Sequence, residues 1–207
     1  MAEIDGRTIR FRQALIATGG EPVSPDIPGL DPAVTVTSDT IWELEARPGR
    51  LAVVGGGPTA CELGQAFARL GTEVTMIVRS RILPKEDPDA ADLVRASLEA
   101  DGVRVLEYSP VENAAVTDSG TLILLRDGTA VDTDTVLLAT GRAPRTAGLG
   151  LERVGVSLDA DGQVITDTRM MTSNPLIRAA GDVTANPGSP TSPAFTHPWP
   201  PRTRCSD

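Results

Sequence analysis

The sequence has little cysteine or histidine and no long apolar run, and each shortage excludes a class of protein. Its 207 residues include two cysteines, Cys61 and Cys205, and one histidine, His197. The cysteines are far apart and fit neither a metal site nor a CxxC redox motif, so we predict no metal centre. No run approaches the roughly 20 apolar residues that span a bilayer, and no signal-peptide core is present. We therefore expect a cytoplasmic protein with no membrane partner.

Basic residues are also in the minority. The chain has 19 lysines and arginines against 28 acidic residues, a formal net charge of −9. This balance disfavours nucleic acid or an anionic membrane as a general partner. The single histidine lies in residues 185–207, which are dense in proline and have no periodicity, so we predict that this tail is disordered. We identify no catalytic residue in it.

The stretch from Leu51 to Arg81 predicts a strand, a glycine turn, a helix and a second strand. Residues 51–54 are wholly apolar and end in three glycines, as in a parallel strand buried on both faces. A helix that ends at Gly71 follows, and residues 73–78 form the next strand. Together they predict a right-handed βαβ crossover. The apolar stripe expected on the helix consists of Ala60, Leu63, Ala66, Phe67 and Leu70.

The glycine turn predicts a dinucleotide site. Gly55 allows a tight turn, and Gly57 lets a pyrophosphate approach the backbone without a Cβ in the way. Pro58 suits the first helical turn, where Thr59 follows, and the small Ala60 allows close packing of helix on strand. Phosphates would then meet free N–H groups at the helix N-terminus. The plainer alternative is a glycine-rich turn in an ordinary α/β domain.

The end of the second strand indicates which dinucleotide binds. An NAD site usually has Asp or Glu there for the ribose 2′-OH, whereas an NADP site prefers arginine for the 2′-phosphate. This chain has Arg79 and Arg81, and no carboxylate before Glu86. We therefore predict NADPH as the nicotinamide dinucleotide. The alternative is that the two arginines belong to a solvated loop.

The other predicted elements surround this unit. A β-hairpin is expected near the N-terminus around an Asp-Gly turn, followed by a short strand and a Pro- and Gly-rich connector. A helix with an Asp-Pro start leads to another strand, and short turns then predict an antiparallel meander. The expected hairpin strands are 2–4 and 8–11, the short strand is 14–17, the helix runs from 87 to 102, the next strand is 103–107, and the meander strands are 111–117, 121–125 and 133–140.

Four spaced motifs carry a resemblance to a known family. The chain resembles the pyridine nucleotide-disulfide oxidoreductases, flavoproteins that bind two dinucleotides. Among its members it is most similar to the mercury(II) reductases, because an arginine follows the strand and Glu86-Asp87 lies downstream. The motifs are ATGG at residues 17–20, VVGGGPTACELGQAFARLG at 53–71, ATGRAP at 139–144 and TSNPLIRAAGD at 172–182.

The resemblance implies roles for further residues. It places Thr18 and Gly19 against FAD, with Gly181-Asp182 at the ribityl and pyrophosphate region of the flavin cofactor. It places Glu62 near the nicotinamide, paired with a lysine of the FAD domain, and Gly141 beside the nicotinamide nucleotide. Without the family, Asp182 would be a helix cap, Glu62 a first-turn acid and both ATG turns ordinary strand ends.

The resemblance also implies a reaction, and some of the motifs that this reaction requires are missing from the sequence. Hydride would pass from NADPH to FAD, and electrons would pass through a dithiol to Hg(II). The family begins with an FAD glycine motif and a CxxxxC disulfide, and it ends with a domain that forms the homodimer. None of these is in the sequence, so we expect a chain truncated at both ends, with FAD binding weak or absent and no catalysis by itself.

Three functional alternatives stay open. The first is the NADPH-binding portion of a mercury(II) reductase-like enzyme, and the second is an NADH-dependent relative similar to dihydrolipoamide dehydrogenase. The third is a non-catalytic nucleotide-binding module, so enzyme status is left open.

The predicted fold is α/β. We expect a Rossmann-like, three-layer NAD(P)-binding domain, a parallel βαβ sheet plus an antiparallel meander, flanked by incomplete pieces of an FAD-binding domain. The predicted boundaries are 1–47 for the first FAD-domain piece and connector, 48–147 for the NAD(P)-binding domain, 148–184 for the return segment and 185–207 for the tail.

Overall fold

The structure is a computed structural model that describes residues 1–118 and 120–185. The described chain divides into two compact units. One is Pro22–Arg142, and the other combines Met1–Glu21 with the described residues from Ala143 onward. Apart from Ala185, the predicted disordered tail lies outside the described residues, and so do Cys205 and His197.

A five-stranded parallel sheet is the centre of the unit Pro22–Arg142. Strands β6 (Arg50–Val54) and β7 (Glu73–Ile77), with the helix between them, form the predicted βαβ unit. Every neighbouring pair in the sheet is parallel. The order across the sheet is β5 (Thr35–Thr37), β12 (Thr135–Leu138), β6 (Arg50–Val54), β7 (Glu73–Ile77) and β8 (Arg104–Leu106).

Two helices cover one face of this sheet. Helix α1 (Pro58–Arg69) starts with proline in its first turn, as predicted, and Gly71 follows its end with φ 88°. Helix α2 (Pro88–Ala100) starts at Asp87, whose carboxylate accepts hydrogen bonds from the N–H groups of Asp89 at 2.9 Å and Ala90 at 3.3 Å. This cap confirms the Asp-Pro start signal.

The predicted apolar stripe of α1 is partly wrong. Ala66 and Leu70 are exposed, and Leu70 retains 66% of its accessible surface. Cys61 and Gly64 are buried in their place, because the helix turns the side that carries them toward the sheet. Gly64 faces β7, since a Cβ added to it would lie 3.4 Å from the sulfur of Met76, at van der Waals contact.

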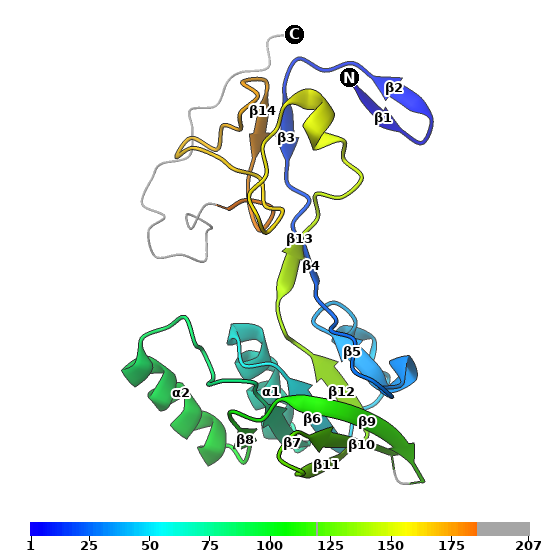
Figure 1. The fold of residues 1–207 in the computed structure, drawn as a ribbon, viewed down its shortest axis with the longest axis vertical. Coiled ribbons are helices and arrows are strands. Elements are labelled where there is room, and N and C mark those ends of the chain that lie inside the picture. Colours follow the sequence, from blue (N-terminus) through cyan, green and yellow to red (C-terminus); the bar gives the residue numbers. More distant parts are fainter. Residues whose placement is uncertain (119, 186–207) are drawn as a thin grey trace. The chain divides into compact units, whose positions relative to one another are not determined.

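An antiparallel meander covers the other face of the sheet, which makes three layers (Figure 1). It consists of β9 (Val111–Thr117), β10 (Gly120–Leu125) and β11 (Ala130–Thr133). The side chains of β6 alternate between the layers: Leu51 and Val53 pack on the helix side, and Ala52 and Val54 pack on the meander side.

The prediction that residues 133–140 form the third strand of the meander is wrong. Strand β11 ends the meander, and the chain then continues as β12, which inserts into the parallel sheet beside β6. The apolar run of β12 is buried between two layers, so its pattern suits a central parallel strand rather than the edge of a meander.

The connector before β6 packs within the sheet unit. Residues 22–47 belong to the same unit as the sheet, to which they contribute β5 and the short 3-10 helices Pro32–Val34 and Ile41–Glu43. Ile27 and Leu30 pack against the meander side of the core, and the N–H of Ala114 donates to the carbonyl of Pro28 at 2.8 Å.

The second unit has its own small core. The hairpin pairs β1 (Ala2–Ile4) with β2 (Arg7–Ile9) around Asp5 and Gly6, which both have positive φ as the Asp-Gly signal predicts. Strand β3 (Ala14–Ile16) pairs in parallel with β14 (Ile177–Ala179). The chain passes between the units at β4 (Gly20–Pro22) and β13 (Arg142–Pro144), and a 3-10 helix spans Leu151–Val154. Val164 forms isolated bridges with Leu158 and Thr184.

Among the described residues, none of the helices has the length and hydropathy needed to cross a membrane.

Gly55 occupies a backbone position in the sheet unit that only glycine fits without strain. Its φ is 140°, and a Cβ there would lie 2.2 Å from the carbonyl oxygen of Ala139. We expect Gly55→Ala to lower the free energy of unfolding by about 2 to 4 kcal/mol, measured by urea denaturation. Gly57→Ala is the control, because a Cβ at Gly57 meets no atom within 4 Å, and we expect a loss below about 1 kcal/mol. Equal stability of the two variants would contradict this account.

Candidate dinucleotide site

A cavity of about 620 Å³ opens within the unit Pro22–Arg142. Three loops that follow three adjacent parallel strands line it: residues 55–59 after β6, residues 78–81 after β7, and residues 139–142 after β12. Strands β6, β7 and β8 progress to one side of the sheet, and β12 and β5 lie on the other. The cavity therefore lies where the strand order reverses, which is where ligands bind in open α/β sheets.

The glycine turn approaches its neighbours closely. The N–H of Gly55 donates to the carbonyl of Ile77 at 3.0 Å, and the N–H of Ala139 donates to that of Val54 at 2.9 Å. A Cβ on Gly56 would lie 2.4 Å from a methyl carbon of Val78. Sequence reasoning gave roles to Gly55 and Gly57 and missed the packing of Gly56.

Gly57 is the N-cap of α1, and no side chain caps this end of the helix. Its neighbours Pro58 and Thr59 line the same cavity. Since the first-turn N–H groups of a helix have no intrahelical partner, this end is suited to a phosphate group. The open space at Gly57 lets such a group approach the backbone.

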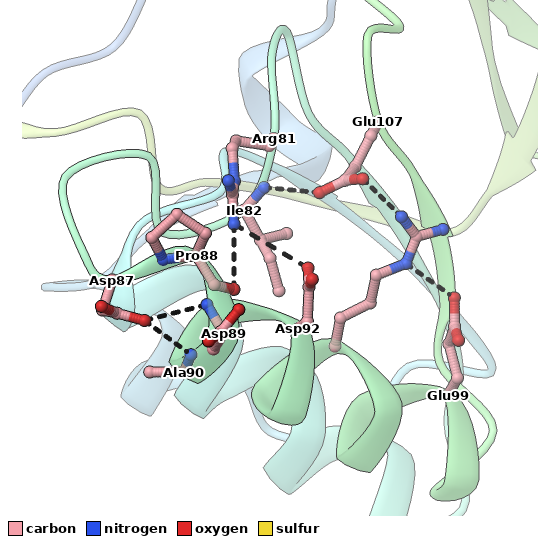
Figure 2. Close-up of polar contacts among 10 residues, drawn as sticks. Arg81, Ile82, Asp87, Pro88, Asp89, Ala90, Asp92, Glu99 and Glu107 are labelled. Atoms are coloured by element: carbon pink, nitrogen blue, oxygen red, sulfur yellow. Dashed lines mark hydrogen bonds and ion pairs between the residues drawn. The ribbon is translucent and has the colours of Figure 1, made fainter.

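The two predicted arginines both line the cavity. Arg79 is exposed. Arg81 is 31% exposed, and its Nη2 donates to the carbonyl of Pro88 at 3.3 Å and lies 3.8 Å from a carboxylate oxygen of Asp92 (Figure 2). The N-terminus of α2 thus holds the guanidinium group of Arg81, whereas the exposed guanidinium group of Arg79 is placed to reach a ligand.

Of the other predicted contacts, Gly141 lines the cavity, and Ala60 and Glu62 do not. Ala60 is completely buried between α1 and the sheet, which fits its predicted packing role. Glu62 is exposed on α1. The described residues do not test its implied pairing with a lysine of the FAD domain, so that pairing stays a prediction.

The cavity is locally basic although the chain is acidic. Five lysines and arginines line it against two acidic residues, Asp26 and Glu86. Sequence reasoning missed three of these cations: Lys85, Arg126 and Arg142. Arg142 follows the predicted Gly141, and its guanidinium donates to Ser38 and Asp39 at 2.9 Å each. A cavity with this excess of cations attracts a multiply charged anion.

In the second unit, the predicted flavin residues follow two paired parallel strands. Thr18 and Gly19 follow β3, and the hydroxyl of Thr18 donates to the carbonyl of Arg145 at 2.7 Å. Gly181 and Asp182 follow β14, and Gly181 has φ 82°. The carboxyl ends of two paired parallel strands lie at the same edge, so the structure brings both turns together. Asp182 is exposed in a turn that ends at Thr184, and no helix follows it within the described residues.

Cys61 is buried on the sheet side of α1, as a small packing residue is expected to be. Burial raises the pKa of its thiol to about 11, and the nearby charge of Glu62 adds to the rise. The thiol therefore stays protonated and is a poor nucleophile at neutral pH. The part of the chain that the structure describes holds no cluster of three or more potential metal ligands.

Comparison with known proteins gives the following similarities. The family model described as pyridine nucleotide-disulphide oxidoreductase matches residues 2–198. The chain is 41% identical to the mercuric reductase of Acidithiobacillus ferrooxidans over 181 residues, which cover 87% of this chain and 33% of that protein. It spans about a third of the length of the curated relatives that it matches.

Two solved structures are similar in fold. The HOCl-induced flavoprotein disulfide reductase from Escherichia coli, as a Cu(II) complex, has a TM-score of 0.79 and 31% identity, over 86% of this chain and 41% of that chain. An engineered water-forming NADPH oxidase bound to NADPH has a TM-score of 0.74 and 29% identity, over 86% and 40%. Its parent, the NADH oxidase from Lactobacillus brevis, is solved with NADH.

The buried thiol leads to a test of α1 packing. In a Cys205→Ser variant, we expect Cys61 to react with a thiol reagent with a pH midpoint near 11, against 9.0 for an unperturbed thiol. At pH 8 the folded chain should react roughly a hundredfold more slowly than the urea-unfolded chain, because less thiolate is present. The thiol of the unfolded chain loses its proton at a lower pH than that of the folded chain. The free energy of unfolding should therefore fall as the pH rises from 9.0 toward 11. Rapid reaction of the folded chain at pH 8 would refute the buried position.

Proposed function

As this chain belongs to the pyridine nucleotide-disulphide oxidoreductases, we propose that its unit Pro22–Arg142 binds NADPH for an FAD-dependent enzyme similar to mercuric reductase. The observation that carries the proposal is the basic cavity at the reversal of strand order. There the glycine turn at residues 55–57 faces the arginine loop, residues 78–83 after β7. A cavity of about 620 Å³ is within the range of small-molecule sites.

The choice of NADPH over NADH is supported by the engineered oxidase. It carries five substitutions. Glycine is changed to alanine, and eighteen positions later aspartate is changed to alanine, with the next two residues changed to arginine and serine. Five positions beyond the serine, proline is changed to arginine. The same spacing in this chain starts at Ala60 and leads to Val78, Arg79 and Ser80. It ends at Lys85, another cation. All five positions therefore carry the residue type of the NADPH form or a close equivalent.

The residues of the site suit the parts of NADPH. The diphosphate fits the backbone around Gly57 at the start of α1, where the first-turn N–H groups lie. Arg79 and Lys85 are exposed at the cavity and supply charge for the 2′-phosphate. NADPH would supply the hydride that reduces the flavin of the full enzyme. The part of this chain in that step is to bind and orient the dinucleotide.

Two alternatives to this proposal are an NADH-dependent enzyme and a module that binds a nucleotide without catalysis. An NADH-dependent relative similar to dihydrolipoamide dehydrogenase would need an acid for the ribose 2′-OH, and this chain has Val78 and Arg79 after β7. A module that binds a nucleotide without catalysis fits the described residues, because their one cysteine, Cys61, is buried. We propose that the polypeptide alone binds NADPH and does not complete the redox reaction.

The dinucleotide preference can be measured directly. We expect calorimetry to give a lower Kd for NADPH than for NADH. Arg79→Ala should raise the Kd for NADPH by roughly tenfold or more and leave that for NADH nearly unchanged, because only the 2′-phosphate loses a charged partner. Arg104→Ala is the matched control, since Arg104 is an exposed arginine on β8 outside the cavity lining. A preference of the unaltered chain for NADH would overturn the proposal.

A further inference from the structure

The arginine loop after β7 is held by backbone hydrogen bonds on two sides. On the β8 side, the N–H of Ser109 donates to the carbonyl of Val78 at 2.9 Å, and the N–H of Tyr108 donates to that of Ser80 at 2.7 Å. On the side of the glycine turn, the N–H of Leu83 donates to the carbonyl of Gly56 at 2.6 Å. The loop is therefore part of the fold rather than a free surface segment.

One side chain completes this support. Glu107 follows the last residue of β8, and its side chain is 13% exposed. One carboxylate oxygen accepts the N–H of Ile82 at 2.8 Å, and the other accepts from Nη1 of Arg95 on α2 (Figure 2). Nε of the same guanidinium donates to Glu99 at 3.0 Å. The carboxylate thus joins the loop, β8 and α2 through its two oxygens.

The hydrogen bond between Ile82 and Glu107 has a residue with positive φ next to each of its ends. Leu83, which follows Ile82, has φ 45°, and Tyr108, which follows Glu107, has φ 55°. Left-handed backbone at residues other than glycine is costly and persists where the surrounding contacts impose it. The Glu107 carboxylate contacts Ile82, the residue before Leu83, and Glu107 itself precedes Tyr108, so it supplies one such contact.

We propose that Glu107 is a positioning residue for dinucleotide specificity. By holding the N–H of Ile82, it fixes the path of the loop and so aims Arg79 at the ribose 2′-position of the nucleotide. Arg95 holds the carboxylate in place and neutralises its charge, which would otherwise repel a nearby phosphate. This inference rests on the proposed NADPH function and deepens it.

The effect should fall on the 2′-phosphate and not on the rest of the nucleotide. The N–H of Gly55 still donates to the carbonyl of Ile77, and the N–H of Cys61 still donates to that of Gly57, and neither bond involves the loop. NADH, which lacks the 2′-phosphate, therefore does not depend on the aim of Arg79. Loss of the Glu107 carboxylate should therefore lower the preference for NADPH over NADH. A residue with a general structural role would weaken both dinucleotides equally.

The test measures Kd for NADPH and for NADH by calorimetry on the full chain. We expect Glu107→Leu to reduce the NADPH preference roughly tenfold, the loss typical of one hydrogen bond to a charged group. Glu107→Gln should retain most of the preference, because its amide oxygen still accepts the N–H of Ile82. Glu99→Gln is the matched control and should keep the preference, since Glu99 contacts Arg95 away from the loop.

If Glu107→Leu does not fold, as judged by thermal unfolding, Glu107→Asp replaces it. Its shorter side chain cannot span from Ile82 to Arg95, so the preference should again fall. A preference within about twofold of the unaltered chain in the folded variant would overturn the role of Glu107. The proposed function fails separately, because it requires the unaltered chain to prefer NADPH, and this is measured first.

Discussion

The site depends on a contact between two stretches of backbone. Gly55 lies so close to the carbonyl of Ala139 that a Cβ would collide with it at 2.2 Å. This approach lets the turn after β6 lie against the end of β12, at the point where the strand order of the sheet reverses. Because the turn lies there, α1 starts at the cavity and its first-turn N–H groups face the same space as the arginine loop.

Charge is distributed to suit this geometry. The chain is acidic overall, and yet cations outnumber acids around the cavity. The acidic residues near the loop are mostly engaged: Glu107 is held by Arg95, and Asp87 caps α2. Arg81 is anchored to the first turns of α2, which leaves Arg79 and Lys85 exposed at the cavity. This distribution of charge suits the dinucleotide that we propose for the cavity, and the chain belongs to the family described as pyridine nucleotide-disulphide oxidoreductase.

Local signals made much of this fold predictable. The strand, glycine turn and helix from Leu51 to Arg69, and the Asp-Pro start of α2, are encoded by neighbouring residues and were placed correctly. The position of β12 was not, because an apolar run does not reveal whether it pairs with a meander or enters a parallel sheet. Arg126 was missed because it lies about 70 residues along the chain from the glycine turn at residues 55–57, and only the fold brings it to the cavity. Glu107 has its meaning only through Ile82, 25 residues away.

The central claim is that backbone amides at the start of α1 hold the diphosphate of NADPH. It is tested most directly by recording the amide resonances of the ¹⁵N-labelled chain during titration with NADPH. The account predicts that the largest shifts occur at Gly57, Thr59 and Ala60, with smaller shifts around Arg79. Shifts confined to residues away from the glycine turn, at NADPH concentrations that saturate binding, would contradict it.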